Sequence, residues 1–268
     1  MIIGIDIGST TTKAVSIEDG KLTRKIKTKA ADAVTSAAGA FGKIVLENGI
    51  KMDAVKRIKI TGAGASKIKD NIFGIPTDKV NEIEAIGIGG MFLSGMNNII
   101  IANIGTGTAI IEAGDGGIFH VGGSGVGGGT ILGLAKKLLP TAELSGIVEL
   151  AKTGNLSRID LLLGDITDTS ISFLNGESTA ANFGKMLDDA NNSDMALAII
   201  NMVYQVIGMI SVFAARARNT DRVIVTGNGS SNKIGQNVLA SVSGMYGIEF
   251  IYPENAEYTT AVGAGLSA

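Results

Sequence analysis

A chain of 268 residues with a formal net charge of -2 provides no positive field for a nucleic-acid backbone or an anionic membrane surface, so neither is an expected partner. Its composition, 45% hydrophobic and 18% charged with no cysteine, excludes disulfides, thiolate nucleophiles and cysteine-bound iron–sulfur clusters. No uninterrupted apolar run approaches the roughly 18 residues of a membrane span, and Met1 leads directly into an apolar strand, so we expect the protein to remain in the cytoplasm.

The first half of the chain predicts an antiparallel meander followed by a helix and a further strand. Strands are expected over residues 2–8, 12–18, 21–29 and 57–60, and a helix over 32–48. The hydroxyl-rich turn from Ser9 to Thr11 joins the first two strands, and Gly49 closes the helix. The last strand runs directly into a glycine-containing turn at 61–64.

The second half repeats the order of strand, glycine turn and helix, with more helices. Strands are expected over residues 98–104, 109–113, 118–121, 222–225 and 249–252. Helices are expected over residues 131–139, 143–152, 179–188, 194–218 and 234–245, and from Glu257 onward. The densest glycine stretch, residues 122–129, precedes the first of these helices, and Pro140 ends that helix.

Two pairs of segments indicate an internal duplication. RIKITGAGAS at 57–66 and RVIVTGNGSS at 222–231 are identical at five of ten positions, and DIGSTTT at 6–12 resembles NIGTGTA at 103–109. The same order in each half favours two copies of one unit, although short strand–glycine turns also look alike by chance in a glycine-rich chain. We therefore predict an α/β fold of two duplicated lobes, each a mixed sheet flanked by helices. The predicted lobes span residues 1–96 and 97–268, and the last helix is free to pack back on the first.

The first turn carries residue types that suit a phosphate and a divalent cation. Asp6, near the end of a strand, can bind Mg²⁺ through oxygen, and Gly8 lets the following backbone approach a phosphate. The expected donors to the phosphate are Ser9, Thr10, Thr11 and Lys13. The alternative is a threonine-rich hairpin that binds nothing.

A second turn repeats this pattern of glycine and hydroxyl residues after a strand. Two hairpin tips that face each other across a cleft would then hold one polyphosphate. Its residues are Gly105, Thr106, Gly107 and Thr108. Further along, Gly227, Asn228 and Gly229 follow a strand and suit an adenine or ribose that lies against bare backbone. A plain connection between strand and helix remains the alternative for that segment.

The glycine stretch at 122–130 opens a helix, whose free N–H groups and dipole favour an anion. The candidates are Gly125, Gly127, Gly128 and Gly129. The stretch is neither a Walker loop, because no Gly-Lys-Ser/Thr follows, nor a Rossmann fingerprint. ATP and Mg²⁺ are therefore the expected cofactors.

This order of motifs resembles, over almost the whole chain, the superfamily of sugar kinases, acetate kinases, heat-shock chaperones and actin. Within it, NIGTGT (103–108), VGGSGVGGGT (121–130) and TAANFGK (179–185) resemble the type II pantothenate kinases. The resemblance implies actin-like (ribonuclease H-like) lobes with a nucleotide cleft between them. It also implies ATP-dependent phosphorylation of the terminal hydroxyl of pantothenate, the first step of coenzyme A biosynthesis, by a homodimer.

The resemblance also implies a general base and a substrate site. The family's base, a Glu after a short Pro-containing segment, falls on Glu82, with Glu84 as the near rival. Thr106 and Gly107 are expected beside the substrate. His120 stands where the family has an Arg; we expect it to contact substrate or the transferred phosphate, and a structural role is the alternative.

Two further features bear on the implied homodimer. By the resemblance, Ala180, Ala181 and Asn182 line the substrate pocket from the partner subunit, although the same stretch also suits a capped helix start. Met195, Met202 and Met209 have heptad spacing, which suits either a dimer helix or ordinary core.

Other functions remain open. GIDIGSTTTKAV resembles the opening of the activators of 2-hydroxyacyl-CoA dehydratases, so an ATPase that activates or reactivates another enzyme is the main rival. Those activators hold an iron–sulfur cluster on cysteines, which this chain lacks. A kinase of the same fold for a different small alcohol, sugar or carboxylate is a second rival, and a nucleotide-binding scaffold in the manner of actin is a third.

Overall fold

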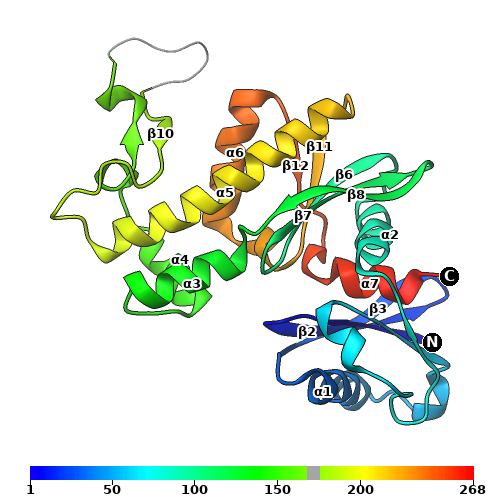
Figure 1. Ribbon diagram of the computed structural model, residues 1–268. Coiled ribbons are helices and arrows are strands. Elements are labelled where there is room, and N and C mark those ends of the chain that lie inside the picture. The colour runs from blue at the N-terminus through cyan, green and yellow to red at the C-terminus, as the bar shows by residue number, and fades with distance from the viewer. Residues whose placement is uncertain (168–175) are drawn as a thin grey trace.

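The computed structural model describes residues 1–167 and 176–268, which form two lobes (Figure 1). The first lobe has a five-stranded sheet in the order β3 (Lys21–Lys29), β2 (Thr11–Glu18), β1 (Ile2–Ile7), β4 (Arg57–Thr61) and β5 (Thr77–Lys79). The second has a five-stranded sheet in the order β12 (Glu249–Ile251), β11 (Arg222–Thr226), β6 (Ile99–Ile104), β7 (Thr108–Gly114) and β8 (Gly117–Ser124). In each sheet two parallel strands extend an antiparallel meander of three. The predicted fold of two duplicated lobes is confirmed.

Helices flank both sheets. They are α1 (Ala33–Glu47), α2 (Glu82–Ser94), α3 (Gly128–Leu138), α4 (Leu144–Ala151), α5 (Asn192–Ala217), α6 (Lys233–Tyr246) and α7 (Thr259–Leu266). A small sheet of β9 (Leu161–Leu162) and β10 (Thr179–Ala181) lies at the end of the second lobe far from α7 (Figure 1).

The two sheets match in detail where their strands end at the cleft. The glycine after β4 and the glycine after β11 share a left-handed backbone, with φ of 85° at Gly62 and 80° at Gly227. A Cβ atom there would lie 2.9 Å from the carbonyl oxygen of Ile7 and 2.5 Å from that of Ile104. Both the positive φ and the close neighbouring strand require glycine. The repeated glycine turns of the sequence therefore mark one backbone geometry used twice.

Most expected elements are present, with ends within three residues of the predicted ones. The sequence pattern does not predict α2, because this helix is apolar on nearly all sides instead of on one stripe. Its glycines face neighbours on different sides: Gly87 lies against Ile118, and Gly90 against Ile101. A helix whose apolar residues are spread around its axis has no amphipathic period in its sequence.

The predicted helix over 179–188 is wrong. Thr179–Ala181 instead forms β10, which pairs with β9. Beyond it, Phe183 and Met186 have positive φ values of 59° and 40°, which interrupt any α-helix. Contacts with residues 158–162 decide this structure, and the local sequence pattern does not show them.

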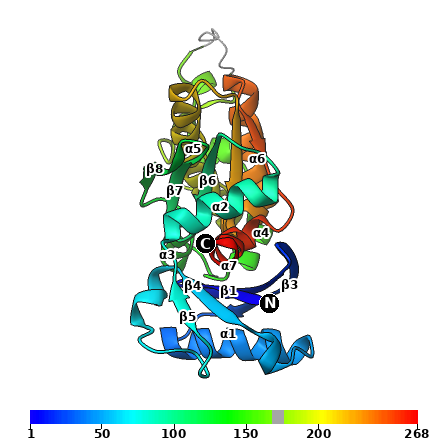
Figure 2. The ribbon, with the colours of Figure 1, turned by 90° about the vertical axis from the view of Figure 1, so that its right-hand side faces the viewer.

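Two helices cross between the lobes. In Figure 2, α7 lies on one face of the first sheet and α1 on the other. Ala261 and Val262 of α7 pack with Val15 and Ile17 of β2. By contrast, α2 follows the first lobe in sequence but packs on the second sheet, where Ile86 belongs to the same buried cluster as the central strands.

The crossing helices touch backbone to backbone. A Cβ atom at Gly263 in α7 would lie 1.7 Å from the carbonyl oxygen of Ala85 in α2, and one at Gly89 would lie 2.0 Å from that of Thr259. Side chains larger than hydrogen are therefore excluded at this contact. Because each helix is anchored on a different sheet, their contact fixes the spacing of the lobes.

The 26-residue helix α5 is long and apolar enough to cross a membrane by length and composition, with a mean hydropathy of 2.0 over its most apolar stretch. Polar residues such as Asn201 and Gln205 interrupt its apolar residues, so it contains no uninterrupted apolar run of that length. Of that stretch, 61% is buried inside the second lobe, as in a core helix. One face of α5 supplies buried residues such as Ile199, Val203 and Ile207 to the lobe's core.

We expect Gly263→Ala to lower the free energy of unfolding by about 3 kcal/mol, because the methyl group would overlap the backbone of α2. Chemical denaturation monitored by circular dichroism measures this. The control is Gly244→Ala in α6, where a Cβ atom meets nothing within 4 Å. That change should stabilise the protein by about 0.5–1 kcal/mol through helix propensity. Equal effects of the two variants would contradict the close contact.

Candidate active site

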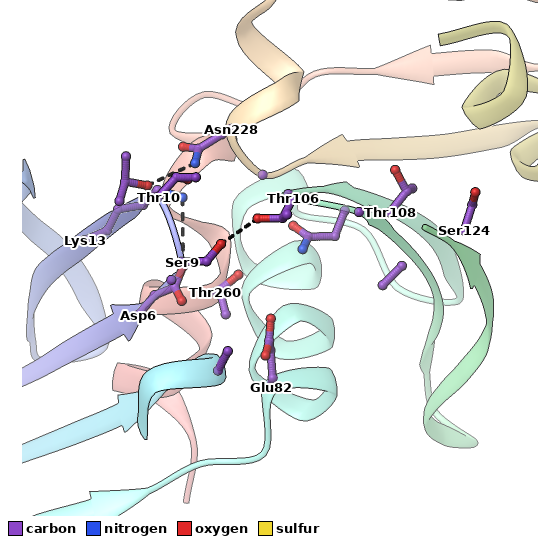
Figure 3. Close-up of a pocket in the computed structure, with 18 residues that line it drawn as sticks. Asp6, Ser9, Thr10, Lys13, Glu82, Thr106, Thr108, Ser124, Asn228 and Thr260 are labelled. Carbon is purple, nitrogen blue, oxygen red and sulfur yellow. Dashed lines mark hydrogen bonds and ion pairs between the residues drawn. The ribbon is translucent and has the colours of Figure 1, made fainter. Parts of the chain in front are cut away.

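A cavity of about 380 Å³ lies between the lobes, where the hairpin tips meet the N-terminal ends of α2 and α7 (Figure 3). Its lining includes these predicted residues: Asp6, Gly8, Ser9, Thr10, Thr11, Lys13, Glu82, Gly105, Thr106, Gly107, Thr108, Gly227 and Asn228. Segments from both halves of the chain therefore share one cavity, as the sequence order predicts.

The first tip places a carboxylate and an ammonium group deep in the cavity. Asp6 is the last but one residue of β1, and its carboxylate lies 3.9 Å from Nζ of Lys13, its antiparallel partner in β2. Burial raises the pKa of Asp6, and Lys13 opposes that shift. Burial likewise lowers the pKa of Lys13, while Asp6 acts in the other direction. Two buried and loosely paired charges of this kind are suited to bind charged ligands.

The tips of the two hairpins touch each other across the cavity. The hydroxyls of Ser9 and Thr106 are hydrogen bonded at 2.7 Å, and Nδ2 of Asn228 donates to Oγ1 of Thr11 at 3.0 Å. Each bond joins the first lobe to the second. Hydroxyl and amide groups from both lobes therefore lie next to one another in the lining of the cavity, where a polyphosphate could reach them together.

Glu82 is the first residue of α2, next to the N-cap Asn81, whose side chain accepts bonds from the next backbone N–H groups. In Figure 3 its carboxylate rises from the helix end toward the cavity. Glu82 is exposed to solvent, yet the cavity walls enclose it enough that burial raises its pKa, and the nearby charge of Asp6 raises it further. Glu84 does not line the cavity, so the geometry favours Glu82 over its near rival.

The glycine stretch before α3 supports the second tip. The N–H groups of Gly128 and Gly129 donate to the carbonyl oxygens of Gly105 and Thr106, at 2.9 and 2.8 Å. The N–H of Gly127 donates to Oγ1 of Thr130. The expectation of free N–H groups at this helix end is therefore wrong for these three glycines.

Close packing requires glycine at some positions of this stretch, of which Gly127 is one. A Cβ atom at Gly127 would lie 2.7 Å from the carbonyl oxygen of Gly107. Gly107 belongs to the lining of the cavity, whereas Gly125, Gly127, Gly128 and Gly129 all lie outside it. Their roles in nucleotide binding stay predictions.

The remaining predicted residues lie away from the cavity. His120 is exposed on β8, and Gly229 contacts Tyr204, whose hydroxyl donates to its carbonyl oxygen at 2.7 Å. Ala180 and Ala181 are exposed on β10, at the far end of the second lobe (Figure 1). Asn182 follows them and donates to Oε1 of Gln205 at 3.1 Å.

Some lining residues are absent from the sequence prediction: Ala63, Asn103, Ala109, Ser124 and Thr260. Asn103 and Ala109 bound the second tip, and Ser124 lies within the glycine stretch, so each is next to residues that the sequence predicts for the site. Nothing in the sequence around Thr260 indicates a site, because α7 reaches the cavity only through its tertiary packing on the first sheet.

Two duplicated lobes that enclose a carboxylate and two hydroxyl-rich tips define an actin-like ATPase or phosphotransferase. Solved structures share this fold. One is the activator of the 2-hydroxyisocaproyl-CoA dehydratase from Clostridium difficile with bound ADPNP, at a TM-score of 0.72 and 18% identity, covering 100% of this chain and 93% of that one. Another is a ROK family glucokinase from Streptomyces griseus in complex with glucose and AMPPNP, at a TM-score of 0.61 and 16% identity, covering 98% and 97%.

The chain belongs to the type II pantothenate kinase family. The Fumble family model matches residues 25–267. A type II pantothenate kinase of Bacillus cereus is 31% identical over 278 aligned positions, covering 99% of this chain and 97% of the relative. One of Staphylococcus aureus is 29% identical, covering 98% of both. The resemblance of the sequence motifs is confirmed.

The raised pKa of Glu82 predicts a dependence of stability on pH. Above the ordinary value of 4.5, the unfolded chain loses this proton more readily than the folded chain, so ionisation of Glu82 opposes folding as pH rises. We expect Glu82→Gln to be more stable than the wild type at about pH 8, and the difference to vanish near pH 4. Urea denaturation at the two pH values measures it. Glu84→Gln, on the same helix turn, is the control; an identical pH response of both variants would contradict the prediction.

Proposed function

We propose that this protein is an ATP-dependent pantothenate kinase, which phosphorylates the terminal hydroxyl of pantothenate in the first step of coenzyme A biosynthesis. The observation that carries the proposal is the single cavity in which a tip from each lobe faces the carboxylate of Glu82. Family membership supports the choice of acceptor. We place the reaction in the cytoplasm, which burial of the apolar helix α5 in the second lobe supports.

The nucleotide is proposed to bind with its polyphosphate between the two tips. The first tip contributes Gly8, Ser9, Thr10, Thr11 and Lys13, and the second contributes Gly105, Thr106, Gly107 and Thr108. The adenosine is proposed to lie beside Gly227 and Asn228, with Gly229 shaping the same loop. Positioning and electrostatic stabilisation of this kind are the main tools of phosphoryl transfer.

Mg²⁺ is proposed to bind at Asp6. Among the described residues the carboxylate accepts no hydrogen bond and has only the distant Lys13 for an ion pair, so its oxygens suit a hard cation. The described residues contain no group of three acidic or histidine side chains that would hold a metal. The other ligands are therefore expected to be phosphate oxygens and water. When bound, the ion neutralises negative charge on the transferred group.

Glu82 is proposed to act as the general base. The terminal hydroxyl of pantothenate gives its proton to the Glu82 carboxylate as its oxygen attacks the γ-phosphorus, and ADP leaves with the bridging oxygen. A pKa raised above the ordinary value makes the Glu82 carboxylate a better proton acceptor than an unperturbed glutamate. Asp6 contributes to that shift through its charge.

The acceptor site is proposed to be completed by a second copy of the chain. Ala180, Ala181 and Asn182 lie too far along the second lobe to reach their own cavity, so a role beside the substrate requires a dimer. The loop that carries them is held in a strained shape: Phe183 has φ of 59°, and its N–H donates to Oδ1 of the buried Asp160 at 2.9 Å. Strain maintained by buried polar contacts is typical of functional segments. Thr106, Gly107 and His120 are proposed as contacts from the chain's own lobe.

The outer face of α5 supports a homodimer. An apolar stripe at helical spacing runs along it: Met202, Val206, Met209 and Phe213. Phe213 is 61% exposed, while Met195 and Met202 also pack against the lobe's core. Both interpretations of the methionine pattern are therefore compatible with this helix.

A second candidate function is an ATPase that activates another enzyme, because the Clostridium difficile activator shares the fold. A kinase for another alcohol, sugar or carboxylate is the third, since His120 stands in place of the family's Arg. Incubation with Mg-ATP and pantothenate, pantetheine, sugars or acetate, followed by mass spectrometry, separates them. A phosphorylated acceptor identifies a kinase and its substrate, whereas ATP hydrolysis without any phosphorylated acceptor would contradict the proposal.

We expect Glu82→Gln to bind ATP as the wild type does and to lose at least about a hundredfold in kcat for pantothenate phosphorylation. Calorimetry measures the binding, and a coupled ADP assay measures the rate. Glu84→Gln should retain activity. Normal turnover by the Glu82 variant would remove this residue as the base.

Mixing two inactive variants tests the shared acceptor site. Glu82→Gln lacks the base, and Ala181→Arg is expected to block the partner's site. In a dimer with composite sites, a mixed dimer keeps one intact site, so a refolded equimolar mixture should recover about a quarter of the wild-type activity. Each variant with itself stays inactive. Failure of the mixture to exceed its components would argue against composite sites.

A further inference from the structure

Asn103 holds in the second lobe the position that Asp6 holds in the first. Each is the last but one residue of the central strand of its sheet, β1 or β6. In the parallel neighbour, Asp6 lies opposite Thr61 and Asn103 lies opposite Thr226. Both side chains line the cavity. The duplication therefore brings two equivalent positions to the same space.

The charge at this position differs between the lobes. Asp6 has Lys13 as its antiparallel partner, whereas Asn103 has Ala109. The ion pair of the first lobe is thus replaced in the second by an amide and a methyl group. The ionisable groups in the described lining are Asp6, Lys13 and Glu82, and all belong to the first half of the chain.

The threonines that lie opposite Asn103 and Asp6 also differ in their hydrogen bonds. Thr226 is fully buried, and its hydroxyl donates to Oδ1 of Asn103 at 3.0 Å. Because this bond holds the carbonyl end of the amide, the Nδ2 end is the donor left for the cavity. In the first lobe the buried hydroxyl of Thr61 has no hydrogen-bond partner among the described residues. Thr61 therefore leaves the Asp6 carboxylate available for a cation.

We propose that Asn103 is a nucleotide-binding residue whose Nδ2 group donates to a phosphate oxygen, while its lack of charge keeps the cation on the Asp6 side of the cleft. The assignment rests on the nucleotide binding proposed above. A polyphosphate is strongly anionic, and the cavity already has two carboxylates against one ammonium group. A third carboxylate would repel the nucleotide, whereas an amide adds a donor without repulsion.

The test is ATP binding measured by titration calorimetry, with Mg²⁺ and separately in EDTA. Asn103→Asp keeps the acceptor for Thr226 but replaces the amide donor with a charge. We expect its Kd to rise about a hundredfold in EDTA and less with Mg²⁺, because a cation binds between carboxylate and phosphate. Asn103→Leu removes the donor without adding charge, and should raise Kd about tenfold in both conditions.

A second substitution provides a matched rescue. Ala109→Lys added to Asn103→Asp rebuilds the ion pair of the first lobe in the second, and should recover about tenfold of the affinity lost in EDTA. Unfolding curves check that each variant is native, and Asn103→Asp decides the outcome if the leucine variant does not fold. If native Asn103→Asp binds ATP in EDTA as tightly as the wild type, the Asn103 assignment is overturned and nucleotide binding stands. If the wild type binds no ATP, the proposed function itself fails.

Discussion

The contact between α2 and α7 is the constraint on which the cleft depends. Each helix is anchored by apolar side chains to a different sheet, and the two meet through glycines, with no side chains between their backbones. Their N-terminal ends therefore reach the cavity at a fixed separation, with Glu82 on one and Thr260 on the other. A spacer of even one methyl group at Gly263 would change the distance between the base and the hairpin tips.

The two lobes share one backbone geometry through duplication, but the side chains at equivalent positions of the cavity differ. The same strand order, the same left-handed glycines and the same pairing of strands recur in both lobes. Yet the first lobe carries the ion pair of Asp6 and Lys13, and the second carries neutral groups at Asn103 and Ala109. Equivalent backbones therefore hold one charged side and one neutral side of a single cavity. An anion lying between them meets donors from both sides.

Much of the fold was readable from the sequence, because strand meanders and left-handed glycine turns leave local signals. The paired tips and Gly227 follow from such signals. The helix α2 does not, since its apolar residues are spread around its axis and form no single stripe. The segment from Thr179 has the local pattern of a helix but forms a strand, because it pairs with Leu161 and Leu162, which the pattern of the segment itself does not show. The sequence also predicts a free N–H at Gly128, but this N–H donates to the carbonyl oxygen of Gly105 in the second tip, a contact that only the tertiary structure shows.

The packing of α7 also has a consequence for how the chain folds while it is being translated. The strand residues Val15 and Ile17 leave the ribosome well before Ala261 and Val262, which cover them in the folded protein. During translation the nascent first lobe therefore exposes an apolar sheet face until α7 has been synthesised. Completion of this lobe waits for α7, although its five strands are all made much earlier.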